Sequence, residues 1–407
     1  MAMEGWILQS SLAGLLSSNA AWPLSKLPLP EPFANLLQQS GLQSPSLDAL
    51  GVARDALTSA PFINAPFVDA LARESTQRME AFVRGVKTYQ AHTFTRALKE
   101  PPTVWRRGVA TLRAYGETGA PVLYVPSLIN RAYILDLAED RSLLRATAKA
   151  GFHGFLLDWG DPGPAEKCFT VEDYIDGVLI PALEEVKART GKPAHLVGYC
   201  LGGTLAVAPA VLRPDLVASL VLLAAPWDFH EGTDASRVLL TWSQPMIEMM
   251  LKAQGVAPID LLQSFFASLD PTLVGRKFRT FAALDPASDQ ARRFVELEDW
   301  LNDGIPLAGP VAEEVLFRWY GENDPLQGRW RVNDVVIDPA RVACPTLAFI
   351  PSQDRIVPPE SARRLAQGIK GAEARQVDLG HIGMIAGGSA PKRVYAPLLE
   401  WLKTSIS

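Results

Sequence analysis

Apolar residues occur in short runs that alternate with segments of helical periodicity over the first half of the chain. Nearly continuous apolar runs, typical of strands buried on both faces, cover residues 121–127, 152–160, 192–198 and 216–226. Helical patterns lie between and after them, at residues 141–151, at 170–190 and from about residue 202. Strands that alternate with helices indicate a parallel sheet covered on both faces, so we expect a doubly wound α/β fold with a mainly parallel sheet.

The strand pattern is interrupted once. Residues 228–320 are helical in pattern and rich in Met, Leu and Phe, whereas strand–helix alternation resumes in residues 321–407. We therefore predict a core whose first half is residues 101–227 and whose second half is residues 321–407, with a helical cap, residues 228–320, inserted between them. Such sheets bind ligands at the carboxyl edge of the strands, which is the edge that a cap would cover.

Residues 1–100 are predicted to form an N-terminal helical extension. Residues 23–45 are rich in Pro, Gln and Ser and read as a linker, and residues 68–99 look helical. Leu8, Leu12, Leu15 and Leu16 would share one face of a helix, which would dock on its own domain or bind a surface or partner. Glu4 is the only early charge, so a signal peptide is not expected. No apolar run reaches the roughly 18 residues of a membrane span.

Composition narrows the function classes. The chain has 407 residues, a net charge of −5 and no long Lys/Arg run, which argues against nucleic acid as a partner. Its three cysteines, at 168, 200 and 344, lack metal-binding or CxxC spacing, so neither a zinc site nor a disulfide framework follows, and a reducing compartment is expected. No GxxxxGK[ST] or HExxH motif occurs, and we expect no cofactor and no metal.

The motif with the clearest chemistry is Gly-Tyr-Cys-Leu-Gly-Gly at residues 198–203. It follows a predicted strand and begins a predicted helix, the context of a nucleophile elbow with Cys200 at its tip. A helix N-terminus favours the thiolate over the thiol. The alternative is a buried core cysteine beside a glycine-rich helix start.

An elbow nucleophile needs an oxyanion hole. The backbone N–H of Leu201 is one expected donor, and the second should come from the loop after the strand at residues 121–126, around Leu128, Ile129 or Asn130. We select Ile129. The alternative for this loop is an ordinary strand-to-helix turn.

The order of a triad in such an elbow fold is nucleophile, acid, histidine. His381, in the loop after the last predicted strand, is the expected base, and His230 is its rival. Asp354, at the end of the preceding strand, is the expected acid, whereas Asp378 lies inside a predicted strand. Asp354 would orient His381, which would take a proton from Cys200 or from an incoming hydroxyl. A thiol exchanges with a thioester at little free-energy cost, so these residues suggest acyl transfer.

From about residue 100 onward the chain resembles the polyhydroxyalkanoate synthases, cysteine enzymes of the α/β-hydrolase fold. The matching blocks are PSLINRAYILDL (126–137), FLLDWGDP (155–162), VEDYIDG (171–177), GYCLGGT (198–204), LAAPWDF (223–229), FVELEDW (294–300), SQDRIVPP (352–359) and LGHIG (379–383). The resemblance implies that Cys200 carries the acyl group, with His381 as base and Asp354 as its assisting acid. Trp300 resembles a tryptophan of the family's cap and dimer region, with core packing as the alternative.

The same resemblance implies polymerisation of (R)-3-hydroxyacyl-CoA into a polyester with release of CoA. It is most similar to the short, class III type, which implies a homodimer, a companion synthase subunit and a cytoplasmic enzyme at the surface of polyester granules. The chain departs from the pattern in its longer N-terminal extension and in Ser127, where the family commonly has a second proline. A thioesterase or depolymerase with the same triad is the enzymatic alternative, and a granule-associated protein with a relict elbow is the other.

Overall fold

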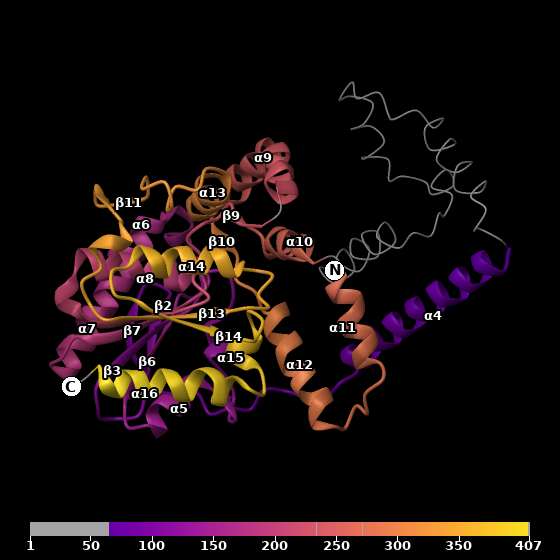
Figure 1. The fold of residues 1–407 in the computed structure, drawn as a ribbon, viewed down its shortest axis with the longest axis horizontal. Helices are drawn as coiled ribbons and strands as arrows, with labels where there is room; N and C mark the ends of the chain where they lie inside the picture. Colours follow the sequence, from indigo (N-terminus) through magenta and orange to yellow (C-terminus); the bar gives the residue numbers. More distant parts are fainter. Residues whose placement is uncertain (1–64, 233, 271, 406–407) are drawn as a thin grey trace. The chain divides into compact units, whose positions relative to one another are not determined.

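A computed structural model of the chain describes residues 65–232, 234–270 and 272–405. Eight strands form one sheet in the spatial order β1-β2-β6-β3-β7-β8-β13-β14 (Figure 1). β1 and β2 are antiparallel to their neighbours, and the six strands from β6 to β14 run parallel. In chain order the strands are β1 (Thr103–Arg107), β2 (Ala110–Tyr115), β3 (Pro121–Val125), β6 (His153–Asp158), β7 (Ala194–Tyr199), β8 (Val217–Leu223), β13 (Thr346–Pro351) and β14 (Glu373–Val377).

Helices cover both faces of this sheet, as the sequence pattern predicts. α5 (Leu143–Lys149) and α16 (Ala396–Thr404) lie on one face (Figure 1). The opposite face carries α7 (Ile180–Thr190), α8 (Leu201–Leu212) and α14 (Pro359–Gly368). Shorter helical segments are α6 (Val171–Tyr174), η4 (Ile175–Leu179), α15 (Gly383–Ala386) and η8 (Pro391–Tyr395). The doubly wound α/β prediction is confirmed.

The apolar runs of the sequence are the central strands. Every residue of β3, β7 and β13 is buried, and so is all of α8 from Leu201 to Val211. Burial of apolar side chains on both faces of the central strands is the main source of stability for a sheet of this kind. The two elements that meet at Cys200, β7 and the start of α8, therefore both belong to this buried core.

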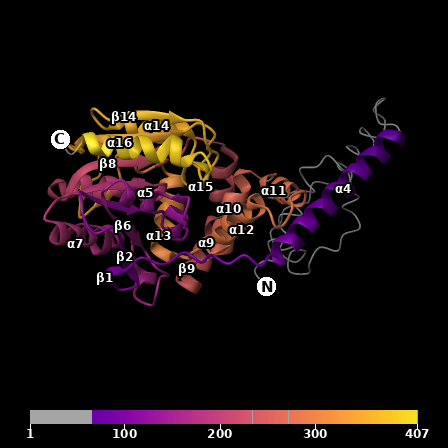
Figure 2. The same cartoon turned by 90° about the horizontal axis from the view of Figure 1, so that it is seen from below.

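Between β8 and residue 321 the described part of the chain is helical, with two short strands. Its elements are α9 (Asp234–Gln254), β9 (Val256–Ala257), α10 (Ile259–Leu269), α11 (Leu273–Phe281), α12 (Asp289–Asn302), β10 (Leu307–Ala308), α13 (Gly309–Glu313) and η6 (Glu314–Gly321). α9 packs against α13 and η6 (Figure 2). After η6, two more short strands, β11 (Arg331–Val332) and β12 (Val335–Val336), form a hairpin.

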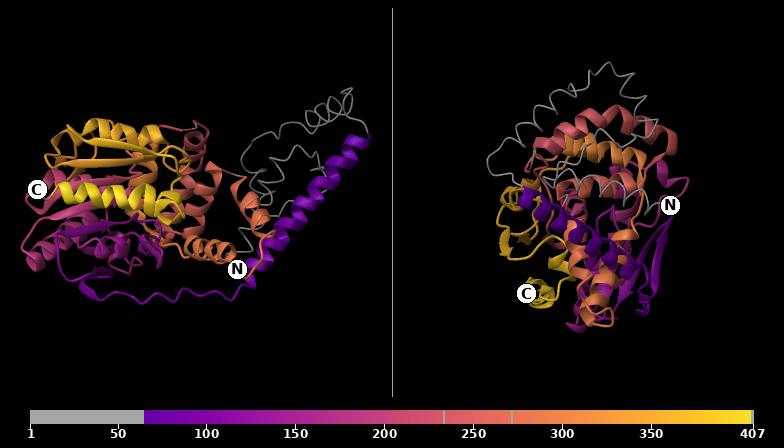
Figure 3. Two further views of the ribbon diagram at one scale, coloured as in Figure 1. Left: turned by 60° about the horizontal axis from the view of Figure 1, so that its bottom comes forward. Right: turned by 90° about the vertical axis from the view of Figure 1, so that its right-hand side faces the viewer.

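The chain divides by contact into two units. One contains α4 (Ala65–Gln90) and residues 272–291, and the other contains residues 93–270 and 292–405. In the first unit α4 runs beside α11 (Figure 3), and Phe278 packs edge-on against Phe82 and Tyr89. The domain boundaries drawn from the sequence stay predictions. The leucines at 8, 12, 15 and 16 lie outside the described residues.

The helix predicted over residues 68–99 is shorter than expected, because α4 ends at Gln90. Thr93, Phe94 and Thr95 are poor helix formers. Arg96 then donates from Nη2 to the Asp136 carbonyl (2.9 Å) and from Nε to the Leu137 carbonyl (3.3 Å), which ties this segment to the core. No helix among the described residues is long and apolar enough to cross a membrane.

Candidate active site

Cys200 is the hinge residue between β7 and α8, and its backbone is left-handed, with φ 55° and ψ −131°. The three neighbouring glycines allow this turn. A Cβ on Gly198 would lie 2.4 Å from Gly203 Cα, and one on Gly202 would lie 2.2 Å from the Val125 carbonyl oxygen. Left-handed backbone at a non-glycine residue costs on the order of 1 kcal/mol or more, and such strain concentrates at functional sites. The predicted sharp turn is therefore present at the predicted residue.

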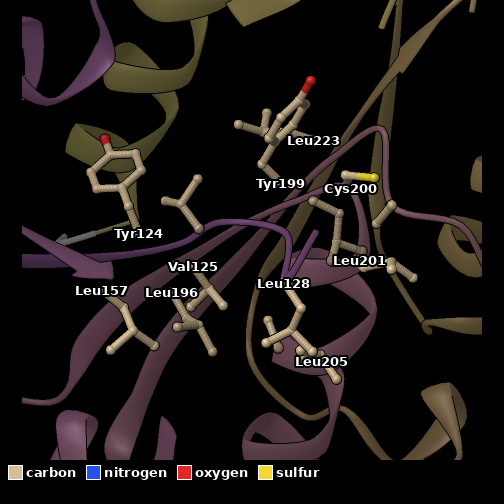
Figure 4. Packing of buried hydrophobic residues seen from close by; sticks show 14 of the residues in the cluster. Tyr124, Val125, Leu128, Leu157, Leu196, Tyr199, Cys200, Leu201, Leu205 and Leu223 are labelled. Atoms are coloured by element: carbon tan, nitrogen blue, oxygen red, sulfur yellow. The ribbon is translucent and has the colours of Figure 1, made fainter. Parts of the chain in front are cut away.

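The turn places the Cys200 side chain at the N-terminus of α8 (Figure 4). Cys200 is 9% exposed, so it lies at the edge of the buried core. Leu201 is the first residue of the helix, and N–H groups of a first helical turn have no carbonyl partner within the helix. The helix macrodipole favours negative charge at this end. A thiolate at Cys200 and an oxyanion near the Leu201 N–H are both suited to this position.

His381 and Asp354 meet at the same edge of the sheet. His381 lies in the loop between β14 and α15, and its Nδ1 is 2.6 Å from Asp354 Oδ2. The other carboxylate oxygen, Oδ1, accepts the backbone N–H groups of Ile356 (2.8 Å) and Val357 (2.9 Å). These bonds fix the carboxylate. Because Asp354 occupies Nδ1, the nitrogen that remains for Cys200 is Nε2.

The environment of His381 favours the imidazolium. Burial opposes the positive charge, but the charges of Asp354 and Cys200, each with a hydrogen bond to the ring, outweigh it and raise the pKa of His381 to about 10. The contact with Cys200 brings all three predicted residues together. The raised pKa favours the imidazolium form of His381 at neutral pH.

Two tyrosines of this site were not anticipated from the sequence. The Tyr199 ring packs on the His381 ring, with centroids 5.1 Å apart, and its hydroxyl donates to the His381 carbonyl oxygen (3.2 Å). Tyr320 comes from η6, and burial together with the charges of Cys200 and Asp354 raises its pKa. The position of Tyr199 beside the nucleophile was the only available signal, and nothing local marks Tyr320.

The predicted oxyanion loop, residues 126–131, follows β3. Within it, the Ile129 N–H donates to Ser127 Oγ at 3.3 Å, a long hydrogen bond. Ser127 is buried and is the position where a proline was expected from the resemblance. The selected donor therefore already has an acceptor, which an incoming oxyanion would replace.

The rival residues have other hydrogen-bond partners, although His230 lines the cavity described below. Asp378 is exposed and accepts Gln353 Nε2 (2.7 Å) at the surface. His230 Nε2 lies 3.0 Å from the Gly321 carbonyl oxygen. His195, inside β7, is buried with its Nδ1 2.7 Å from Ser219 Oγ.

A cavity of about 250 Å³ lies next to Tyr320 and the residues after Asp354, and Cys200, Asp354 and His381 are not among the residues that line it. Its walls come from the loop after β8, from η6 and α9, and from the loop that follows Asp354. Phe229 and Tyr320 give it an apolar side, and their rings meet edge-on with centroids 5.0 Å apart. Arg237 and Arg355 also line it. A cavity with apolar walls and a few charged groups is typical of a site for an organic ligand.

The other two cysteines lack these features. Cys168 is exposed and Cys344 is half-buried, and burial raises the pKa of the Cys344 thiol to about 11, which leaves it unreactive. Among the described residues, no three His, Cys, Asp or Glu side chains cluster as metal ligands would.

Comparison with known proteins places this geometry in context. The family model for the alpha/beta hydrolase fold matches residues 120–387, which include Cys200, Asp354 and His381. The poly(3-hydroxyalkanoate) polymerase subunit PhaC of Allochromatium vinosum is 30% identical over 287 residues, which cover 69% of this chain and 80% of that protein. The PhaC subunit of Synechocystis sp. is 30% identical over 292 residues, covering 69% and 77% respectively. Among solved structures, a thermophilic esterase from Thermogutta terrifontis has 18% identity and a TM-score of 0.47, covering 77% of this chain and 100% of that one.

Proposed function

Because this chain belongs to the poly(3-hydroxyalkanoate) polymerases, within the alpha/beta hydrolase fold, we propose that it joins (R)-3-hydroxyacyl groups from CoA thioesters into a polyester held on Cys200. The observation that supports this most is the cysteine at the tip of the elbow, in contact with the His381–Asp354 pair. A cysteine acyl-enzyme is itself a thioester, so it keeps the acyl group activated towards an alcohol.

In the acylation step, the Cys200 sulfur attacks the thioester carbonyl carbon of 3-hydroxyacyl-CoA. The carbonyl oxygen becomes an oxyanion, which the N–H groups of Leu201 and Ile129 stabilise. The bond to the CoA sulfur then breaks, and His381 gives its Nε2 proton to the departing thiolate. The products are CoA and an acyl group on Cys200, with His381 now neutral.

In the transfer step, neutral His381 removes the proton of the 3-hydroxyl group of a second 3-hydroxyacyl-CoA, whose oxygen attacks the acyl carbon on Cys200. The carbon–sulfur bond breaks, an ester bond forms, and the Cys200 thiolate is restored beside the imidazolium. Asp354 holds the ring in one orientation through both steps and stabilises its charged form. The lengthened acyl-CoA then acylates Cys200 as in the first step, so each cycle returns the chain to Cys200 one unit longer and releases one CoA.

The surroundings of Cys200 favour an alcohol over water as acceptor. Cys200 is nearly buried, and the aromatic pair Phe229 and Tyr320 gives the cavity described above an apolar wall suited to a hydroxyacyl chain. Arg237 and Arg355 line the same cavity, where Asp228 and Glu231 also lie, and the phosphates of CoA would have to replace the ion pair of Arg355 with Asp270 (2.6 Å). Partial exclusion of water protects an activated acyl group from hydrolysis.

The assembly in which this chain works is part of the proposal. The resemblance to the short, class III type supports a homodimer with a companion subunit, at the surface of polyester granules in the cytoplasm. The N-terminal extension, residues 1–100, is the part of the chain that could replace the companion.

The proposal is tested by incubating the purified chain with 3-hydroxybutyryl-CoA, measuring CoA by chromatography, and identifying the acyl product by mass spectrometry. Cys200→Ala should abolish CoA release, and Cys168→Ala, which changes an exposed thiol, is the matched control and should not. We expect oligomeric esters. CoA release that yields only free hydroxy acid would instead identify a thioesterase or depolymerase, and release that is unchanged in Cys200→Ala would indicate a relict elbow.

A further inference from the structure

Two buried tryptophans hold the ends of the loop at residues 126–131. Trp159, just after β6, donates its Nε1–H to the Pro126 carbonyl oxygen (3.1 Å). Trp300, in α12, donates its Nε1–H to the Arg131 carbonyl oxygen (2.9 Å). Trp159 and Trp300 are 2% and 3% exposed, so water competes little for either hydrogen bond.

The chain that follows Trp300 runs alongside the same loop. Residues 130 and 304 form an isolated antiparallel bridge, and the Ile305 N–H donates to the Ile129 carbonyl oxygen (3.3 Å). The Arg131 side chain adds an ion pair to Asp303, with Nε and Oδ1 3.1 Å apart. Residues 300–305 therefore contact three successive loop residues, 129, 130 and 131.

These contacts restrain one peptide group before and one after the peptide that carries the Ile129 N–H. The carbonyls of Pro126, Ile129 and Arg131 all have donors, and peptide planes rotate as rigid units. The Ile129 N–H itself has a weak internal acceptor, Ser127 Oγ at 3.3 Å. The anchored carbonyls hold the loop in place, whereas the Ile129 N–H can exchange its bond to Ser127 Oγ for a bond to the oxyanion.

We propose that Trp300 is a positioning residue for the oxyanion hole: its indole N–H, with residues 303–305, holds the loop so that the Ile129 N–H faces the carbonyl group attacked by Cys200. This inference rests on the proposed function. In this role Trp300 acts within its own subunit, whereas the two interpretations from the sequence were a place in the cap and dimer region and core packing. The segment after α12 thereby sets the geometry of a loop that follows β3.

The test replaces the Trp300 indole by an isostere without N–H. Benzothienylalanine at position 300 keeps the ring volume and deletes the donor, and Trp300→Phe is the conventional variant. Trp330 is the matched control, because it is also 3% exposed and its Nε1 has no hydrogen-bond partner among the described residues. The readouts are kcat and KM for CoA release from 3-hydroxybutyryl-CoA, Tm, and the rate of Cys200 alkylation by iodoacetamide.

Loss of one oxyanion donor typically costs 10²- to 10³-fold in kcat, and a misdirected donor should cost about tenfold or more. We expect that fall with benzothienylalanine at 300, with KM and Tm close to those of the same replacement at 330. Alkylation forms no oxyanion, so its rate should be equal in the two proteins. Equal kcat values at 300 and 330, or a parallel fall in alkylation, would overturn the inference.

Failure of the proposed function is distinguishable from failure of this inference. If the unmodified chain releases no CoA, the function is wrong, and the loop is then tested with p-nitrophenyl acetate, whose acyl transfer forms the same kind of oxyanion. A loss at 300 relative to 330 with that ester supports the role of Trp300 whatever the natural substrate. No loss overturns it.

Discussion

Tyr199 and His381 are joined twice, by ring against ring at 5.1 Å and by a hydrogen bond from the Tyr199 hydroxyl to the His381 backbone carbonyl. The residue before the nucleophile thus holds the loop that carries the base. Tyr199→Phe keeps the ring and removes the hydrogen bond, which is worth about 1 kcal/mol. We expect kcat for CoA release to fall about fivefold. Tyr124→Phe, which removes a buried hydroxyl that bonds Thr147, is the control and should leave kcat unchanged.

Asp354→Asn should remove the carboxylate that keeps His381 in its charged form. The Asp354 carboxylate raises the pKa of His381 against the effect of burial, so its loss should bring the ring to the neutral form at pH 7. By analogy with other triads, kcat should fall about 10³- to 10⁴-fold. Nitrogen NMR of histidine-labelled protein would follow the ring directly. Asp378→Asn, at an exposed carboxylate, is the control, and an imidazolium that persists in Asp354→Asn would contradict the assignment.

The raised pKa of His381 also makes the free energy of unfolding depend on pH. The folded protein holds the proton more tightly than the unfolded chain, so the contribution is fully present below pH 6.5 and is lost as the pH rises towards about 10. In urea denaturation, the free energy of unfolding of Asp354→Asn should therefore fall less between pH 7 and pH 10 than that of the unsubstituted protein.

His195 should make the free energy of unfolding depend on pH in the opposite direction. Burial lowers its pKa to about 4, so the unfolded chain binds a proton that the folded protein refuses. Its contribution to stability is lost as the pH falls from about 6.5 to about 4. With these values the loss is about 2 kcal/mol at pH 5. Urea denaturation at pH 7 and pH 5 measures it, and His195→Asn should remove most of the difference. An equal loss in the variant would show that other groups cause it.

Ser127→Ala tests the competition at the oxyanion loop. Ser127 Oγ accepts the Ile129 N–H in the resting protein, and the substrate oxyanion must replace that weak bond. Removal of the hydroxyl should raise the acylation rate by up to about threefold, since the bond is long and worth less than 1 kcal/mol. Rapid-quench measurement of the acyl-enzyme gives the rate. Ser127→Thr keeps a hydroxyl and should show no gain, and a slower Ser127→Ala would mean that the hydroxyl supports the loop.

Gly202→Ala should disrupt the elbow. The added Cβ would meet the carbonyl oxygens of Val125 and Pro126 at 2.2 and 2.4 Å, which are backbone atoms that cannot turn away. We expect a loss of about 3 kcal/mol or more in the free energy of unfolding, or no folded protein. Gly177→Ala, in η4 with nothing within 4 Å, should instead stabilise by about 0.5–1 kcal/mol. Similar effects of the two changes would rule out close packing as the reason for Gly202.

Local patterns explain why much of this fold could be predicted. Continuous apolar runs are enough to identify β3, β7 and β13, and the glycines around Cys200 identify the turn because their constraint is steric and short-range. Asp354 and His381 could be ranked because both follow strands of a parallel sheet, whose carboxyl ends share one edge.

The rest depends on contacts between distant residues. Nothing in the sequence around Trp300 shows that its indole bonds a carbonyl at residue 131, and nothing around Tyr320 shows its proximity to Cys200. The end of α4 at Gln90 was missed because the charge pattern continues beyond it, whereas Arg96 already bonds the core. The grouping of residues 272–291 with α4 follows from aromatic packing around Phe278 that has no local signal.

The placement of the three site residues across the sheet has a thermal consequence. Cys200 leaves β7, an interior strand buried along its whole length, but His381 follows β14, the edge strand, most of whose residues are exposed or half-buried. Segments with few buried apolar contacts open at lower free energy than core strands in hydrogen exchange. On warming, His381 should therefore separate from a still intact elbow, so that heat inactivation precedes global melting and reverses on cooling while the core remains folded.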